Sequence, residues 1–124
     1  MERVIVNTAY SDRRGVILDL VVDQIDAITE ITFEKDAIRG NHFHKETTQW
    51  TYVVYGKIQA FTKNKDVVVS DIFKEGELFV SKPLEPHAMK AIIPSKILVF
   101  TQGPRSGENY HTDTFPTSII EYHE

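Results

Sequence analysis

The chain has 124 residues, which is enough for one domain and too few for two of ordinary size. Its formal net charge of -4 argues against a nucleic-acid or anionic-membrane partner, and the absence of cysteine excludes disulfides and thiolate metal sites. No apolar run approaches the roughly 20 residues needed to span a bilayer. Charged residues occupy the N-terminal stretch where a signal peptide needs an apolar run, so we expect a cytoplasmic protein.

Short β-rich runs separated by turn signals follow one another along the chain. We expect strands at Val4–Asn7, Val16–Val22, Ile28–Phe33, Asn41–His44, Thr48–Tyr55, Lys57–Thr62, Val67–Phe73, Leu78–Val80, Ala88–Ile93 and Ile97–Gln102. The intervening turn signals are SDRRG, YGK, KNKD, KEGE, KPLEP, IPSK and QGPRSGEN. The pattern predicts one all-β domain over residues 1–124, a sandwich or a barrel. Gly103–Glu124 is its least regular segment and is expected to cover the barrel mouth or to pair with a partner chain.

Two histidines in the stretch IRGNHFHKETTQWTYVVYG form the candidate site. His42 and His44 share one face of the expected strand, because successive side chains in a strand point to opposite faces. If the next strand keeps this register, one of its faces carries Gln49, Thr51, Val53 and Tyr55, and the other carries Trp50, Tyr52 and Val54. Large side chains on both faces predict that the strand is covered on both sides, by another sheet or by a second subunit.

Two motifs resemble the pair that marks the cupin superfamily. The first is HFH followed by Gln49 and Gly56, similar to His-x-His, three or four residues, Glu, six residues and Gly. The second is GELFVSKPLEPHAM, in which Gly76, Pro83 and His87 match the Gly, Pro and His of the family motif. The resemblance implies an all-β cupin fold, a double-stranded β-helix or jelly-roll barrel with a site in its interior. Gln49 departs from the family pattern, since metal-binding cupins usually carry glutamate there.

Within that superfamily the chain is most similar to the RmlC-like dTDP-sugar 3,4-ketoisomerases of the WxcM-like type. Their first motif is matched by Arg39, Gly40, His42, His44, Lys45 and Gln49, and their second by Pro83, His87 and Met89. Their early Asp-Arg-Gly turn resembles Asp12, Arg14 and Gly15, and their C-terminal acidic-tyrosine segment is matched at Tyr110. The resemblance implies an isomerase or epimerase that acts on a 4-keto-hexose nucleotide, a small-molecule substrate. Chains this short commonly extend their core by oligomerising, so we also expect a homodimer.

The first hypothesis for the histidines is acid–base catalysis without a cofactor. An imidazole gains or loses a proton near neutral pH, and moving a ketone along a sugar needs both steps on adjacent carbons. On the ketoisomerase likeness His42 and His44 are the acid–base pair, and Gln49 orients a ring or the substrate. Arg39 and Arg14 are candidate diphosphate ligands, because a guanidinium matches phosphate oxygens in a two-point fork. Tyr110 is a further candidate substrate contact at the barrel mouth.

The second hypothesis is a metal site. His42, His44 and His87 supply three imidazoles and Gln49 a carbonyl oxygen, a set suited to a divalent ion such as zinc, nickel, iron or manganese. Because every ligand is neutral, the ion would keep its full charge and be bound more weakly than with glutamate. Two alternatives stay open beside these: a non-enzymatic cupin that binds a small ligand, and histidines that only fill a hydrogen-bonded core.

Overall fold

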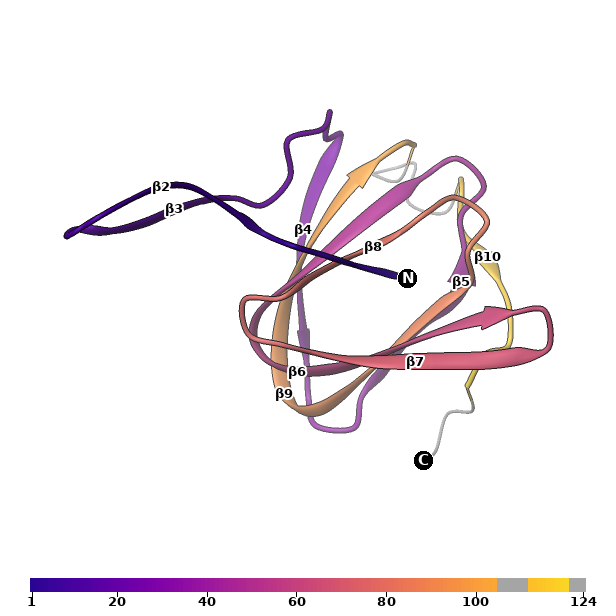
Figure 1. Ribbon diagram of the computed structural model, residues 1–124. Coiled ribbons are helices and arrows are strands. Elements are labelled where there is room, and N and C mark those ends of the chain that lie inside the picture. Colours follow the sequence, from indigo (N-terminus) through magenta and orange to yellow (C-terminus); the bar gives the residue numbers. More distant parts are fainter. Residues whose placement is uncertain (105–111, 121–124) are drawn as a thin grey trace.

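The computed structural model describes residues 1–104 and 112–120, and these form an all-β structure without helices (Figure 1). The strands are β1 (Glu2–Val4), β2 (Asn7–Asp12), β3 (Gly15–Asp19), β4 (Ala27–Phe33), β5 (Ile38–Phe43), β6 (Thr48–Asn64), β7 (Val67–Lys74), β8 (Leu78–Ser81), β9 (His87–Gln102) and β10 (Phe115–Pro116). The all-β prediction is confirmed. In the described part of the chain no helix is long and apolar enough to cross a membrane.

Eight of the strands form one antiparallel sheet that closes around an interior. Its strand order is β1-β8-β6-β9-β5-β10, and β4 and β7 pair with β9 and β6 beside this path. Apolar side chains fill most of the interior: Phe33, Val53, Ile58, Ala60, Phe73, Phe79, Met89, Ala91, Ile97 and Val99. Polar residues are buried where β6 begins, at Gln49 and Thr51. The apolar core therefore leaves one polar region inside the barrel.

The long strands β6 and β9 correct the predicted strand boundaries. YGK and IPSK were expected to be turns, yet each is a bulge within one continuous strand, where the β6–β9 register shifts around Gly56. Gly56 has a φ of +96°, and a Cβ there would lie 2.1 Å from Ser95 Oγ. The Ser95 hydroxyl accepts a hydrogen bond from Lys57 N at 3.0 Å and donates one to Ile93 O at 2.7 Å. The two bulges thus pack against each other, and each strand bends without ending.

Side-chain alternation along β6 follows the prediction as far as the bulge. Gln49, Thr51 and Val53 are buried, whereas Tyr55 is 44% exposed because the register shifts between Val53 and Tyr55. On the other face Trp50 and Tyr52 are half-buried. The prediction that both faces are covered is therefore met only in part within one chain.

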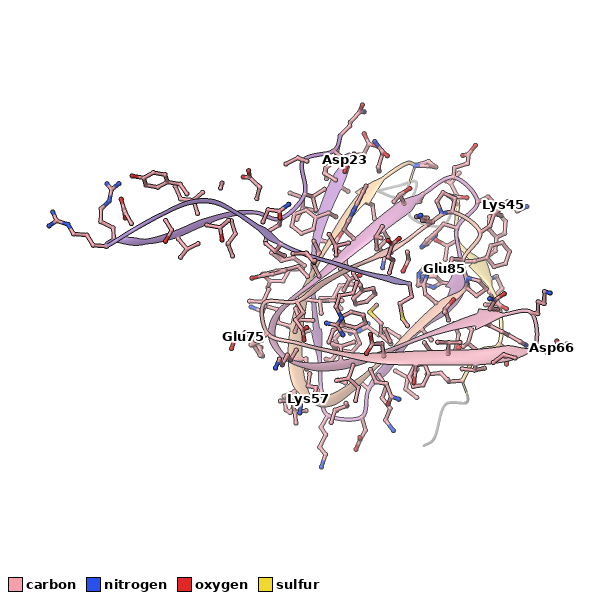
Figure 2. All side chains as sticks on the ribbon, in the orientation of Figure 1. Asp23, Lys45, Lys57, Asp66, Glu75 and Glu85 are labelled. Carbon is pink, nitrogen blue, oxygen red and sulfur yellow. The ribbon has the colours of Figure 1, made fainter. Side chains whose placement is uncertain are left out.

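The hairpin of β2 and β3 lies apart from the barrel. The two strands form a sheet of their own, and the outer part of the hairpin stands clear of the barrel (Figure 2). Tyr10, Val16, Ile17 and Leu18 expose between 43% and 59% of their surface. The predicted strand Val4–Asn7 is wrong, since β1 ends at Val4 and β2 begins at Asn7. The turn at Arg13 and Arg14 closes this unexpected hairpin.

Candidate functional site

Strands β5 and β9 bring three histidines together. His42 lies directly opposite His87 in the β5–β9 pair, and His44 follows β5 by one residue. The ring centroids are 4.8 Å apart for His42 and His44, 4.6 Å for His42 and His87, and 5.0 Å for His44 and His87. The prediction that both motif histidines share a face and meet a third from the distant KPLEPHAM segment is confirmed.

Gly40 allows β5 to approach β9 closely beside the histidines. It has a φ of +99°, and a Cβ there would lie 2.8 Å from His87 O and 2.9 Å from Ala88 Cα. The register shifts between Gly40 and His42, where Asn41 adopts a positive φ of 57°. This bulge turns the chain so that His42 faces His87.

The protein backbone orients two of the three imidazole rings. His44 Nδ1 lies 2.6 Å from the carbonyl oxygen of Asp113, and His87 Nδ1 lies 3.3 Å from that of Glu85. A carbonyl oxygen only accepts hydrogen bonds, so each of these contacts is a hydrogen bond in the form of the ring that is protonated at Nδ1. In the neutral form Nε2 of each ring then holds the lone pair, which is the nitrogen that accepts a proton or binds a metal ion.

Gln49 and Ser81 add unsatisfied polar atoms to the barrel interior. They face each other across the β6–β8 pair and are 3% and 2% exposed. Gln49 Nε2 donates to Thr51 Oγ1 at 3.4 Å, but Gln49 Oε1 and Ser81 Oγ have no hydrogen-bond partner among the described residues. Buried polar atoms of this kind are costly unless a ligand or water satisfies them. Sequence reasoning missed Ser81, which lies one residue beyond the predicted strand Leu78–Val80 and is found only from the β6–β8 register.

A cavity of about 280 Å³ opens beside the histidines, and its lining residues are Ile31, Ile38, Arg39, Gly40, His42, Gln49 and Met89. Arg39 donates to Thr32 O at 3.1 Å, and its guanidinium lies 5.3 Å from the centre of the Phe33 ring. No carboxylate of the described residues lies within ion-pair distance of Arg39. The cavity thus combines one imidazole, one amide and one cation available to an anionic ligand.

The C-terminal segment is bound to β5 at His42 and at its two neighbours, Asn41 and Phe43. Strand β10 pairs with Phe43 and His42, and the Phe115 and Phe43 rings stack at 5.4 Å. The Asn41 side chain accepts hydrogen bonds from Ile119 N and Ile120 N, both at 3.1 Å. Residues 112–120 thus pair with β5 of the same chain, and the two-residue strand β10 was not foreseen. That the segment after Gly103 covers the barrel mouth or pairs with a partner chain stays a prediction.

Asp113 anchors the other end of this segment, and its side chain is 3% exposed. Its carboxylate accepts hydrogen bonds from Lys45 N, Glu46 N, Thr47 N and Thr47 Oγ1, all at 2.9 Å. Burial by itself raises the pKa of the Asp113 carboxyl group, but these hydrogen bonds together outweigh it and hold the pKa below its ordinary value. No motif in the sequence pointed to Asp113, since its partners lie 66 or more residues away.

The two remaining predicted substrate contacts are not brought to the cavity. Arg14 lies at the turn of the β2–β3 hairpin, where its Nη2 pairs with Asp12 Oδ2 at 2.7 Å. Tyr110 lies outside the described residues. Of the predicted set, the structure therefore gathers His42, His44, His87, Gln49 and Arg39 in one region of one chain.

A comparison with protein-family models decides the family. The cupin model matches residues 24–120, a range that contains both histidine motifs and the whole barrel after the hairpin. The chain is a cupin. Its fold class was therefore predicted correctly from the two motifs. Among curated proteins, none matches this cupin in sequence.

Several solved structures share the fold of this cupin. The 3,4-ketoisomerase QdtA from Thermoanaerobacterium thermosaccharolyticum, determined with TDP, is 19% identical with a TM-score of 0.73, over 92% of this chain and 87% of QdtA. The dTDP-4-dehydrorhamnose 3,5-epimerase from Sulfolobus tokodaii is 17% identical with a TM-score of 0.63, over 79% of this chain and 68% of the epimerase. The capsular polysaccharide assembling protein CapF from Staphylococcus aureus is 14% identical with a TM-score of 0.68, over 93% of this chain and 34% of CapF.

The histidine cluster of this cupin also fits a metal ion. One ring nitrogen from each of His42, His44 and His87 can be chosen so that all lie within 4.8 Å of one another. Two nitrogens that bind one ion with bonds of about 2.1 Å lie at most about 4.2 Å apart. Small shifts of the side chains would therefore bring all three nitrogens within bonding distance of a single ion. Backbone carbonyls at Nδ1 of His44 and His87 are typical partners of metal-binding histidines. Gln49 Oε1 is a candidate fourth donor.

Proposed function

We propose that this cupin isomerises or epimerises a 4-keto-hexose nucleotide by proton transfer through His42 and His44. The observation that carries the proposal is the convergence of the imidazoles beside a cavity that also presents Arg39 and Gln49. Membership of the cupin family and the shared fold with QdtA and the 3,5-epimerase support this reaction class. One of the QdtA structures contains TDP-4-keto-6-deoxyglucose, a compound of the proposed substrate class.

The reaction needs only proton transfers to and from carbon and oxygen, with no net oxidation or reduction. One imidazole removes the proton from the carbon next to the ketone, the electron pair forms the C=C bond of an enediol, and the former carbonyl oxygen takes up a proton from a second, protonated imidazole. A proton then returns to the former carbonyl carbon, while the adjacent hydroxyl gives up its proton and becomes the new ketone. Epimerisation differs only in that the proton returns to the first carbon on its other face. An imidazole suits both steps at neutral pH.

The other cavity residues have roles in binding. Arg39 is exposed at the cavity and can pair with the diphosphate of a nucleotide sugar. Gln49 presents a buried amide whose Oε1 has no described partner, so it can accept a hydrogen bond from a substrate hydroxyl. These contacts would hold the sugar against His42 and leave the chemistry to the imidazoles.

The proposal predicts hydrogen exchange with solvent at defined carbons. Incubation with TDP-4-keto-6-deoxyglucose in deuterium oxide should place deuterium on the carbons that flank the ketone, as read by proton NMR and mass spectrometry. The corresponding guanosine and uridine diphosphate sugars serve as controls for the nucleotide. A complete lack of exchange with all three nucleotides would rule the reaction out.

A second candidate function is metal-dependent chemistry at the same cluster. It is favoured by the two Nδ1-to-carbonyl contacts, which leave Nε2 of His44 and His87 as the donor atoms. A divalent ion held by His42, His44, His87 and Gln49 would supply Lewis-acid polarisation of a bound oxygen. Elemental analysis of protein prepared without nickel resin tests this candidate. A content near one equivalent supports it, and less than about a tenth of an equivalent counts against it.

We further propose that the protein is a homodimer held together by the β2–β3 hairpin. An isolated two-stranded hairpin is marginally stable in water, and this one has no partner strand in the described residues. Figure 1 shows the hairpin on the same side of the barrel as β4, an edge strand on which Ile28 is exposed. In a two-fold dimer the hairpin of each copy would pack against the β4 side of the other copy, so both exposed surfaces would be covered. Such a contact would also carry Arg14 to the partner's surface.

A charged substitution on the hairpin is expected to separate the dimer. In sedimentation velocity the unmodified protein should run as a dimer and Ile17→Asp as a monomer, because a buried unpaired carboxylate is costly. Val67→Asp is the matched control, since Val67 is equally exposed but lies at the far end of the molecule, next to Asp66 in Figure 2. A monomeric unmodified protein, or a dimer that Ile17→Asp leaves intact, would contradict the proposal.

A further inference from the structure

Asp113 contacts both the ring of His44 and the backbone that follows it. Its carbonyl oxygen meets His44 Nδ1 at 2.6 Å, and its carboxylate binds the three backbone N–H groups that follow His44. A fourth hydrogen bond comes from the Thr47 hydroxyl. One residue from a distant part of the chain therefore fixes both the ring of His44 and the backbone that carries it.

The carbonyl contact defines which nitrogen of His44 can take up a proton. A neutral imidazole carries one N–H and exists as two tautomers, and a backbone carbonyl can pair only with the tautomer protonated at Nδ1. With that proton engaged, a proton removed from a substrate can bind only at Nε2. The 2.6 Å contact is short, and it lies in a buried environment where hydrogen bonds are strong.

The carboxylate is what keeps this carbonyl in place. Strand β10 has two residues, too few to hold the segment 112–120 by pairing alone. Asn41 holds the far end of the segment, through Thr117, Ile119 and Ile120. At the near end the buried Asp113 carboxylate accepts four hydrogen bonds. Removing the carboxylate would leave the His44 side of the segment without its main attachment.

We propose that Asp113 is a positioning residue that locks His44 in the Nδ1–H tautomer, so that Nε2 is the proton-accepting nitrogen of the site. The effect on turnover rests on the proposed isomerase function, whereas the tautomer itself does not. Asp113 does not line the cavity, so in this proposal it acts only through His44. No resemblance or motif in the sequence assigned a role to it.

The tautomer is measured by NMR on the full chain labelled with nitrogen-15 in histidine, at a pH where the rings are neutral. In the unmodified protein His44 should show a protonated Nδ1 and an unprotonated Nε2, with an Nδ1 proton that exchanges slowly. In Asp113→Ala the His44 signals should move to the average of two tautomers, and the slow proton should be lost. If isomerase turnover is present, kcat should fall about 10- to 100-fold with little change in KM, because the cavity residues are untouched.

Two further variants keep the test decisive. Asp113→Asn retains one acceptor oxygen, so its His44 signals should lie between those of the unmodified protein and those of Asp113→Ala. If Asp113→Ala does not fold, Asp113→Asn by itself tests the proposal. Asp71→Asn is the matched control, because Asp71 Oδ1 accepts a hydrogen bond from Ile72 N at 2.8 Å on β7, a strand that pairs with β6 and not with the strands that carry the histidines. An unchanged His44 pattern in both Asp113 variants would overturn the proposal. An absence of turnover in the unmodified protein would instead count against the isomerase function and leave the tautomer result standing.

Discussion

Replacing His44 by asparagine is expected to lower kcat for isomerisation by roughly 10²- to 10⁴-fold, the usual contribution of a positioned acid or base. The asparagine amide can still donate to Asp113 O from the place of Nδ1, but it has nothing at the place of Nε2. The segment 112–120 should therefore stay attached, and the loss should fall on kcat rather than on stability. His42→Asn is expected to cause a loss of the same order. The measurement is the initial rate of conversion of TDP-4-keto-6-deoxyglucose by NMR.

His87→Asn separates the two candidate chemistries. His87 lies within 5.0 Å of both other rings, so a metal site would need it as much as it needs His42 and His44. The acid–base account predicts that His87→Asn loses clearly less activity than the other two variants. Equal losses in all three variants, accompanied by loss of bound metal, would support the metal site instead.

Gly40→Ala is expected to destabilise the fold and to disturb the site together. The added Cβ would lie 2.8 Å from His87 O and 2.9 Å from Ala88 Cα, and both of these are backbone atoms of β9 that cannot rotate away. The positive φ of +99° adds strain for any residue with a Cβ. Together these effects should cost about 3–5 kcal/mol of unfolding free energy. Because His42 pairs with His87 beside this point, activity in the remaining folded protein should fall as well.

Gly76→Ala is the matched control for backbone strain without a steric clash. Gly76 has a φ of +84°, and a Cβ there would meet nothing within 4 Å. Its substitution should cost only about 1–2 kcal/mol, the penalty of a left-handed conformation. Urea unfolding of the two variants measures the difference. Equal destabilisation would show that contact with β9 is not the reason for glycine at position 40.

The fold was predictable because its signals are local. Alternation from Gln49 to Val53, the turn-forming clusters and the two histidine motifs each lie within a short stretch, and together they indicate an all-β cupin. Two of the errors came from bulges that bend strands without ending them. Gly56 and the IPSK segment read as turns in sequence, but their bulges pack together, which only the pairing of β6 with β9 reveals.

The site residues that belong to the two histidine motifs were predictable from the sequence, and the others were not. Strand alternation placed His42 and His44 together, and the second motif supplied His87. Asp113 and Ser81 escaped notice because their partners come from long-range pairing, through the segment 112–120 and the β6–β8 register. The position of Arg14 on a separate hairpin could not be predicted either, because a turn motif does not show whether the strands beside it join the barrel sheet.

Deuterium exchange by metal-depleted protein tests the central claim of imidazole acid–base chemistry most directly. The protein is treated with a chelator to less than about a tenth of an equivalent of metal and mixed with TDP-4-keto-6-deoxyglucose in deuterium oxide. His44→Asn, treated in the same way, runs beside it. The account predicts deuterium on the carbons flanking the ketone with the unmodified protein and at least roughly 100-fold slower exchange with His44→Asn. Exchange that vanishes on chelation and returns when zinc, nickel, iron or manganese is added would contradict it.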